Sequence, residues 1–293
     1  MDSDYAATGK RPLRSQPRAR RLVGLAVLLV GSSVLLSGCS EADWDQIKRL
    51  AQPESASDRA DPMFDLWIGG WIAAFAVGFL VWGLIIWCII RYRRRSDEQV
   101  PTQTEYHLPL EVLYTIAPLI VVAVFFFHSV QTQDKVQEVI ENPDHEVVVV
   151  GEKWAWTFNY LDEPSVGETV YDVGTPDQLS QLWLPVDESV TFTLVSPDVI
   201  HSFWVPEFLY KLDVIPGDQN RFSLTPTREG VFQGRCAELC GVYHSRMLFE
   251  LHIVSPEEYE QHLAELQDKG QVGLTTGGNY ADEVAGLEGG TKS

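Results

Sequence analysis

The stretch Cys236-Ala237-Glu238-Leu239-Cys240-Gly241-Val242-Tyr243-His244-Ser245-Arg246-Met247 places two thiols, an imidazole and a thioether within twelve residues of a 293-residue chain. All four side chains are soft or borderline ligands for transition metals. A further ligand is available upstream, where His201 opens the sequence His-Ser-Phe-Trp-Val-Pro just after a predicted strand. These residues predict a metal site held between strands.

The number of cysteines decides which kind of metal site is expected. One Cys, two His and a weak axial Met form a mononuclear blue-copper site, the ligand layout of cupredoxin sandwiches. Because both Cys236 and Cys240 are present, two thiolates can bridge two metal ions, with one histidine for each. Met247 would then be the axial ligand of one ion and a backbone carbonyl, that of Glu238, the axial ligand of the other. Two bridged metals can share an electron with little change in geometry, which favours electron transfer over substrate chemistry.

Two simpler interpretations of these residues remain open. A CxxxC pair outside the cytoplasm can form a disulfide, and zinc can be held by Cys236, Cys240, His201 and His244. Neither interpretation gives Met247 a role. The other histidines, His107, His128, His145, His252 and His262, have no such neighbours and are interpreted as structural or surface residues.

Two apolar segments precede this region and predict a membrane hairpin over residues 64–130. Residues 66–90 carry no charge and are long enough to span a bilayer, and residues 112–130 form a second span that contains Pro118. The connecting loop, residues 91–111, begins with four arginines in five residues, which places it in the cytoplasm. Residues 39–63 and everything after residue 130 are then expected outside the cytoplasm.

Residues 1–38 have the pattern of a signal peptide, with six basic residues between 10 and 21 followed by an uncharged run over 22–36. The end of this segment, Leu36-Ser37-Gly38-Cys39, resembles a bacterial lipobox, in which Cys39 becomes the acylated N-terminus of the mature protein. The alternative is an uncleaved anchor in which Cys39 is incidental.

Residues 131–269 predict an all-β domain. Trp154, Trp156, Phe158 and Tyr160 alternate with smaller or polar residues, which is typical of a strand with one aromatic face. Further strands are expected at 146–150, 181–186, 189–195, 221–224, 230–235 and 247–254, and residues 161–180 as an inserted loop. Ser255-Pro256-Glu257-Glu258 predicts a helix start, with Tyr259, His262, Leu263 and Leu266 on its apolar face. The polar, Gly-rich residues 270–293 predict a disordered tail.

The charge of the chain is distributed unevenly. Residues 1–128 carry 13 basic and 13 acidic side chains, whereas residues 129–293 carry 9 basic and 28 acidic side chains. An acidic outer domain is a poor partner for nucleic acid and a good one for a basic protein.

Taken together, these motifs resemble the cytochrome c oxidase subunit II family of the haem-copper oxidases over residues 60–268. The resemblance includes the ligand loop 236–247 and four other motifs: Lys153-Trp154-Ala155-Trp156, Asp198-Val-Ile-His201-Ser-Phe-Trp, Asp213-Val-Ile-Pro216-Gly217 and Glu111-Val-Leu-Tyr114-Thr115-Ile-Ala-Pro118. Residues 205–209 resemble actinobacterial members. The sequence departs from the family in having Ala155 where an aromatic residue is often found, and in the insertion at 161–180.

The resemblance implies a two-helix transmembrane hairpin plus an all-β cupredoxin-like extracytoplasmic domain in the cell membrane. It implies two copper ions, the CuA centre, held by His201, Cys236, the Glu238 carbonyl, Cys240, His244 and Met247, and a Mg ion at the subunit I interface through Glu238. It also implies electron entry at Trp154 and a proton path that begins at Glu111, although Trp154 can equally be a packing residue and Glu111 a partner of the helix dipole. The expected partners are oxidase subunits I and III and a cytochrome c, either soluble or the membrane-bound one of the cytochrome bc complex. Asp198, Glu207, Asp213 and Asp218 are the expected docking carboxylates.

Two other functions compete with electron transfer from cytochrome c. Subunit II of a quinol oxidase shares the membrane topology but lacks the copper ligands. A membrane copper chaperone of the Sco type also has a CxxxC motif, but that motif is followed by Pro within a thioredoxin-like fold, whereas here Gly241 follows.

Overall fold

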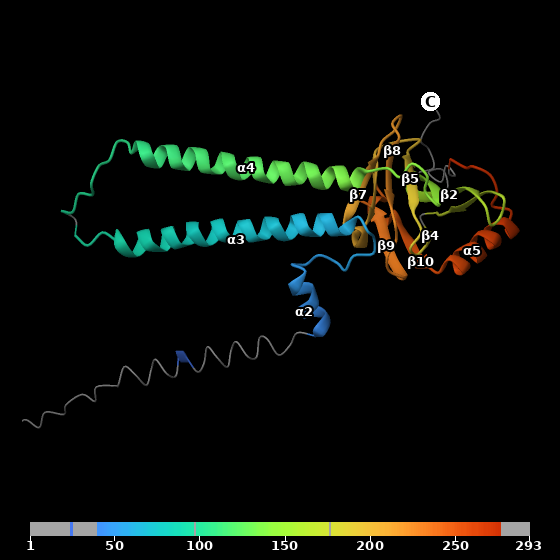
Figure 1. The fold of residues 1–293 in the computed structure, drawn as a ribbon, viewed down its shortest axis with the longest axis horizontal. Coiled ribbons are helices and arrows are strands. Elements are labelled where there is room, and N and C mark those ends of the chain that lie inside the picture. Colours follow the sequence, from blue (N-terminus) through green and yellow to red (C-terminus); the bar gives the residue numbers. More distant parts are fainter. Residues whose placement is uncertain (1–23, 26–39, 97, 176, 277–293) are drawn as a thin grey trace, which may run out of the picture. The chain divides into compact units, whose positions relative to one another are not determined.

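The computed structural model of the protein describes residues 24–25, 40–96, 98–175 and 177–276 (Figure 1). The predicted lipobox and almost all of the predicted signal peptide lie outside these residues. The helix α2 (Glu41–Lys48) is an element that was not predicted. Ser40 caps it, because the Ser40 hydroxyl accepts a hydrogen bond from the Asp43 N–H and the Asp43 carboxylate accepts one from the Ser40 N–H.

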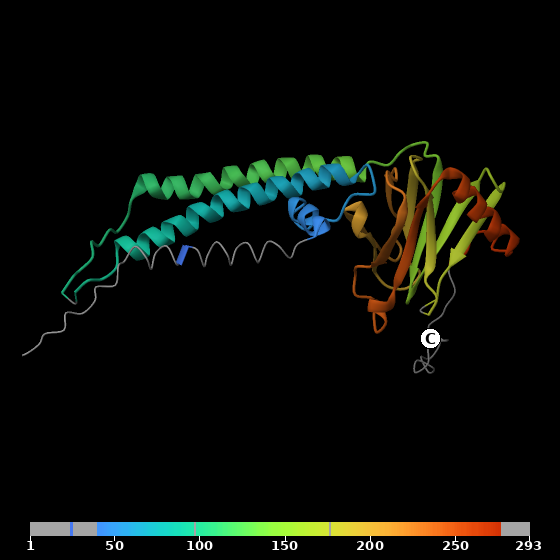
Figure 2. The same ribbon diagram turned by 90° about the horizontal axis from the view of Figure 1, so that it is seen from below.

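Two long apolar helices form the predicted hairpin. Helix α3 (Ala60–Arg91) and helix α4 (Leu108–Gln137) are both long and apolar enough to cross a membrane, and they lie side by side in both views (Figures 1 and 2). Both helices extend beyond the predicted spans 66–90 and 112–130, because their polar ends continue the helix outside the apolar stretch. Helix α4 accommodates Pro118 in its interior, as membrane helices do when neighbouring groups satisfy the freed carbonyl.

The outer domain is a sandwich of two five-stranded sheets, as the predicted all-β cupredoxin-like fold requires (Figure 2). The first sheet has the order β3 (Glu168–Val173), β2 (Ala155–Glu163), β1 (His145–Glu152), β5 (Val190–Val195), β8 (Asn220–Leu224). The second has the order β4 (Ser180–Pro185), β10 (Leu248–Val254), β9 (Gly230–Cys236), β6 (His201–Val205), β7 (Tyr210–Val214). β1 pairs with β5 and β4 pairs with β10 in parallel, and the other pairs within the sheets are antiparallel.

An aromatic cluster fills the space between the sheets. Trp156 packs edge-on against Phe203 and Phe249, with ring centroids 5.8 and 5.6 Å apart, and all three side chains are buried. Gly234 on β9 leaves room for this cluster, because a β-carbon at that position would overlap the ring of Phe249. Large aromatic side chains such as these each bury a large apolar area, together with the valines and leucines of the same core.

Two segments of the domain differ from the sequence-based expectations, and β2 is more buried than its alternating pattern requires. Both faces of β2 are buried, because Asn159 on the face opposite the aromatic stripe donates to the Val148 carbonyl and accepts from the Thr275 N–H. Residues 161–180 are not a plain loop, since they contain the end of β2 and the whole of β3, which pair through a bulge. Residues 271–276 are not a disordered tail, since the Gln271 carbonyl accepts from the β3 backbone and Val272 forms a bridge with it.

Helix α5 (Pro256–Asp268) packs against β3 and β4, edge strands of the two sheets, and confirms the predicted helix. Its buried side chains are the four expected ones, Tyr259, His262, Leu263 and Leu266. Tyr259 donates from its hydroxyl to Glu163 at 2.9 Å, and Glu163 also contacts His145 Nδ1 at 3.0 Å. His145 Nε2 lies 2.7 Å from Glu188. This histidine therefore connects β1 to two carboxylates and, through Glu163, to α5.

The ionisation of His145 makes the stability of the domain depend on pH. Burial lowers the pKa of His145, but the hydrogen bonds with Glu163 and Glu188 outweigh burial and raise that pKa above its ordinary value of 6.5. A raised pKa in the folded state stabilises the fold fully below pH 6.5, and this stabilisation is lost as the pH rises through the raised value. We expect His145→Gln to lower the free energy of unfolding by about 1–3 kcal/mol below pH 6.5 and to flatten its pH dependence above it. Thermal unfolding of the purified chain in detergent, from pH 5.5 to 8.5, measures both effects.

The matched comparison is Glu188→Gln, which removes the more exposed partner and keeps the buried Glu163. This variant should show a smaller loss over the same pH range. An equal slope in wild type and His145→Gln would contradict the assignment of the pH dependence to His145.

Candidate metal centre

The ligand loop joins two neighbouring strands of the second sheet. Strand β9 ends at Cys236, and β10 begins at the residue after Met247. The Cys236 N–H donates to the Met247 carbonyl at 2.9 Å, so the ladder between the strands continues up to the loop and closes it. The last turn before Met247 is a short 3-10 helix, η2 (His244–Arg246). Both ends of the loop are therefore fixed by the sheet.

The donor atoms of the loop gather around the two sulfurs. Cys236 Sγ lies 3.9 Å from Cys240 Sγ and 3.2 Å from the Glu238 carbonyl oxygen. Cys240 Sγ lies 3.6 Å from His244 Nδ1 and 3.8 Å from Met247 Sδ. Each thiol thus has one weak axial donor beside it, the Glu238 carbonyl at one and the Met247 thioether at the other.

The sixth donor comes from the neighbouring strand β6, which begins at His201. His201 is fully buried, and its Nδ1 lies 3.8 Å from Cys236 Sγ. Its other nitrogen, Nε2, lies 2.8 Å from Asp198 Oδ1. Asp198 is itself held by the backbone N–H groups of Lys153 and Val199. A carboxylate on the outer nitrogen fixes the orientation of a metal-binding histidine and increases its basicity.

The geometry favours the two-metal interpretation of the cysteines over a disulfide or a single zinc ion. The Sγ atoms are 3.9 Å apart, whereas a disulfide has a bond length of about 2.05 Å, and both cysteines are free. A single zinc ion would need all four donors around one point. Among the described residues, the donors of His201, Cys236 and Cys240 lie within 4.8 Å of one another, but His244 does not join this group. The two histidines therefore lie beside different thiols, an arrangement that fits two ions bridged by two sulfurs.

The thiols are also prepared for metal binding electrostatically. Hydrogen bonding with Cys240, and then with His201 and with the backbone at Glu238 and Ser202, lowers the pKa of the Cys236 thiol well below its ordinary value. The same interaction raises the pKa of Cys240. The pair therefore releases its first proton readily and retains the second until a cation replaces it.

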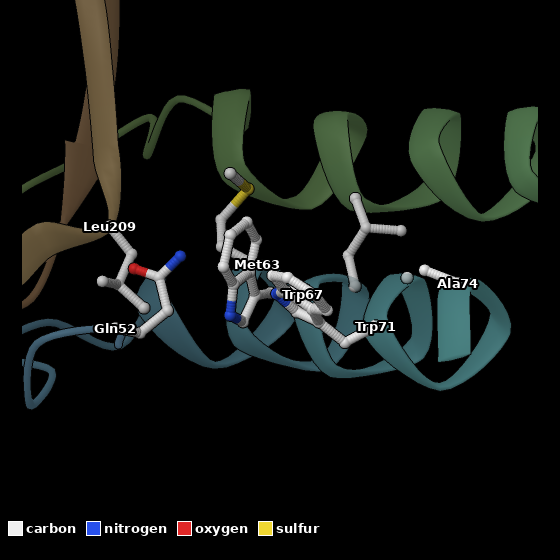
Figure 3. Close-up of a pocket in the computed structure, with 8 residues that line it drawn as sticks. Gln52, Met63, Trp67, Trp71, Ala74 and Leu209 are labelled. Atoms are coloured by element: carbon white, nitrogen blue, oxygen red, sulfur yellow. The ribbon is translucent and has the colours of Figure 1, made fainter. Parts of the chain in front are cut away.

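The cavities beside α3 contain none of these ligands. A cavity of about 390 Å³ lies against α3 and is lined by Met63, Trp67, Trp71, Ala74, Leu209 and Gln52, among others (Figure 3). Another, of about 590 Å³, lies between α3 and α4. The first has no titratable or metal-binding lining group apart from the Met63 thioether, whereas the lining of the second includes Asp65, His128 and Lys135.

Trp154 packs on the ligand loop, but it is more buried than a surface entry residue would be. It precedes β2, and only 6% of its surface is exposed. A β-carbon on Gly241, whose φ is +132°, would lie 3.0 Å from the Trp154 indole, so glycine permits this close contact. The indole also meets the ring of Tyr243 edge-on, with centroids 5.1 Å apart.

The four predicted docking carboxylates fall into two groups. Asp213 and Asp218 are exposed, and Asp213 lies opposite Ser202, the neighbour of His201. Asp198 is half-buried as the hydrogen-bond partner of His201, and Glu207 is half-buried with one carboxylate oxygen shielded from solvent. The geometry thus gives Asp198 a role that the sequence interpretation missed, although the Asp-x-x-His spacing was visible.

Glu111 lies in the first turn of α4, at the cytoplasmic end. Its carboxylate accepts a hydrogen bond from the His107 N–H at 2.8 Å, and the His107 ring accepts one from the Leu110 N–H. Both contacts cap the helix, so Glu111 has a structural partner in the isolated chain.

Comparison with known proteins identifies the family. The model of the cytochrome c oxidase subunit II periplasmic domain matches residues 146–254, and that of the subunit II transmembrane domain matches residues 47–132. The probable cytochrome c oxidase subunit 2 of Streptomyces avermitilis is 42% identical over 92% of each chain. The chain belongs to the cytochrome c oxidase subunit II family.

Other members of the subunit II family are also similar to this chain. Cytochrome c oxidase subunit 2 of Mycobacterium tuberculosis is 32% identical, over 86% of this chain and 83% of the relative. The crystal structure of the periplasmic domain of subunit II of cytochrome oxidase from Bradyrhizobium japonicum is 26% identical and has a TM-score of 0.40, covering 45% of this chain and 99% of that one. The actinobacterial resemblance is therefore confirmed.

Membership of the subunit II family establishes the kind of complex to which the chain belongs and its location. The chain is a component of an oxidoreductase complex in the membrane, with its C-terminal domain outside the cytoplasm and oxidase subunits as its partners. The β-sandwich excludes the thioredoxin-like fold of a Sco-type chaperone. The complete set of ligands argues against a quinol oxidase subunit II.

The contact between Asp198 and His201 leads to a prediction for metal affinity. Asp198→Asn keeps an acceptor for His201 Nε2 but removes the negative charge, so we expect copper affinity to fall about 10- to 100-fold. Competition with a copper chelator on the purified chain measures this change. Asp162→Asn, an exposed carboxylate at the end of β2, is the control and should bind copper like wild type. Unchanged affinity in Asp198→Asn would show that this carboxylate only accepts backbone hydrogen bonds and does not support metal binding.

Proposed function

We propose that this subunit accepts electrons one at a time from a cytochrome c and passes them to a haem in subunit I. Oxygen is reduced to water there, and protons are pumped. The residues that hold the redox centre are His201, Cys236, Glu238 through its carbonyl, Cys240, His244 and Met247. When bound, the copper pair supplies a one-electron centre whose two redox states differ little in geometry.

One observation carries this proposal, namely that each thiol has its own histidine and its own weak donor. Cys236 lies beside His201 Nδ1 and the Glu238 carbonyl, and Cys240 lies beside His244 Nδ1 and Met247 Sδ. Such a duplicated set suits two soft, redox-active ions with shared thiolates better than one structural ion.

The other roles follow from position in the chain. The exposed Glu238 side chain is free to contact a Mg ion at the subunit I interface, because the contact with Cys236 uses only its backbone carbonyl. Glu111 at the cytoplasmic start of α4 is proposed to begin a proton path in the assembled oxidase, where subunit I can replace the His107 contact.

The copper content tests the proposal directly. The purified chain loaded with copper should hold about two ions per chain and give an electron paramagnetic spectrum of one unpaired electron shared equally between them. Met247→Leu should keep both ions but make them inequivalent, because a weak axial donor is lost from one side only. Cys236→Ser or Cys240→Ser should lower the content to about one ion or fewer, because a bridging thiolate is lost.

The matched control for the cysteine variants is Cys88→Ser, which changes the free, exposed cysteine of α3. It should leave the copper content and the spectrum unchanged. A single copper per wild-type chain, or preferential binding of zinc without redox activity, would refute the proposed centre.

The acidic surface gives a prediction for donor association. Asp213 and Asp218 are exposed near the His201 end of the domain, so they should steer a basic cytochrome c toward the site. The second-order rate of electron uptake should fall roughly tenfold or more as the Debye length shortens to about 8 Å at physiological salt. Asp213→Asn/Asp218→Asn should lower the rate at low salt and weaken its salt dependence, with intact copper. Stopped-flow mixing with a soluble basic cytochrome c measures both.

The control pair is Glu257→Gln/Glu260→Gln on α5, which removes the same charge at the opposite end of β10 from Met247. A salt-independent rate in wild type would favour a donor that is permanently attached to the oxidase instead.

A further inference from the structure

The family resemblance implies electron entry at Trp154, and the burial of this residue raises the question of how an electron reaches it from a donor on the surface. With 6% of its surface exposed, the indole offers little area to an incoming protein. Its Nε1 is completely shielded and has no hydrogen-bond partner. Electron transfer slows steeply with each gap between donor and acceptor, so the group that covers Trp154 matters as much as Trp154 itself.

Tyr243 is the aromatic residue in contact with Trp154 on the ligand loop. The two rings meet nearly perpendicularly, at 80°, with centroids 5.1 Å apart. Tyr243 is half-buried, and its neighbour Val242 is 75% exposed. The tyrosine therefore has one side against Trp154 and another open to solvent.

Tyr243 is also joined covalently to the metal site, because the next residue is His244, whose Nδ1 lies 3.6 Å from Cys240 Sγ. Tyr243 thus reaches the surface, contacts the buried indole and directly precedes the proposed ligand His244.

The orientation of the Tyr243 ring is fixed by a cation. The guanidinium of Arg246 lies over this ring, 5.5 Å from its centroid, and is paired with Asp177 at 2.8 Å. A positive charge over an aromatic face stabilises the contact and makes the ring harder to oxidise. Asp177 belongs to the 161–180 insertion, so the insertion is connected to the ligand loop at this point.

We propose that Tyr243 is the surface end of the electron entry route and bridges a docked redox protein to Trp154, an inference that rests on the proposed function. One electron leaves the ferrous haem of the donor, which becomes ferric, and one electron is gained by the copper pair. No bond is made or broken, and no proton moves. Tyr243 and Trp154 are unchanged at the end, and the cation at Arg246 makes Tyr243 a bridge rather than an oxidised intermediate.

The first experiment measures electron entry in the assembled oxidase after flash reduction of a bound cytochrome c. Tyr243→Phe retains the ring and should keep the rate within about twofold of wild type. Tyr243→Ala should slow entry at least tenfold while copper content, spectrum and potential stay unchanged. The matched control is Tyr171→Ala, a half-buried tyrosine on β3 outside the ligand loop, which should behave like wild type. An unchanged or faster rate in Tyr243→Ala would show that the tyrosine only covers Trp154 and would overturn the proposal.

A second experiment does not depend on electron transfer. Hydroxyl-radical footprinting of the full copper-free chain should modify Tyr243 and spare Trp154, and adding a soluble basic cytochrome c should protect Tyr243 but not Tyr171. In Tyr243→Ala, Trp154 should become modified. Equal labelling of Tyr243 with and without cytochrome c would contradict its place in the docking surface. Failure of the proposed function itself would look different, because the wild-type chain would then accept no electron at all.

Discussion

The hydrogen bond from the Cys236 N–H to the Met247 carbonyl is the constraint on which the metal centre depends. It extends the pairing of β9 and β10 by one more residue pair at the ends of the two strands and closes the ligand loop there. With both ends fixed, the loop has to turn within residues 237–246, and this turn brings Cys240 back to Cys236 and His244 to Cys240. A ligand set on a free loop would have to order itself on binding, whereas this one is already held by strands.

The aromatic core packs against the ligand loop through Trp156. Trp156 reaches from β2 toward the Met247 carbonyl, with 3.4 Å between Nε1 and the oxygen, and its ring also contacts His201. A single buried side chain therefore touches the end of the ligand loop and the strand that supplies His201. Because core packing is close, a change in Trp156 would shift the axial donor and the upstream histidine together. The core and the site form one packed unit rather than a scaffold with separate attachments.

Much of this arrangement could be predicted from the sequence, because the apolar residues of these segments follow a clear helical, strand or membrane-span pattern. The two spans, seven of the ten strands and the buried face of α5 follow from runs of apolar or alternating residues. The failures have physical causes. Thr157 and Asn159 are polar, which by itself suggests a solvent-exposed outer face of β2. Residues 271–276 nevertheless cover this face, and such a long-range contact cannot be predicted from a local sequence pattern. Asp198 was taken for a surface charge, because its bond to His201 depends on a turn that sequence spacing alone does not fix.

The segments on both sides of the membrane hairpin are hydrogen-bonded to the outer domain. Residues 54–58, before α3, bond to the turn after β8 through Thr225, Thr227 and Arg228, and Ile140, after α4, bonds to Ser223 within β8. Arg59 additionally joins the start of α3 to the end of α4. A domain on one flexible tether can rotate about it, whereas a domain clamped on both sides of the same hairpin has no such axis. Folding of the chain therefore already fixes the orientation of the domain. Aligning the domain with its electron acceptor then costs little additional orientational entropy.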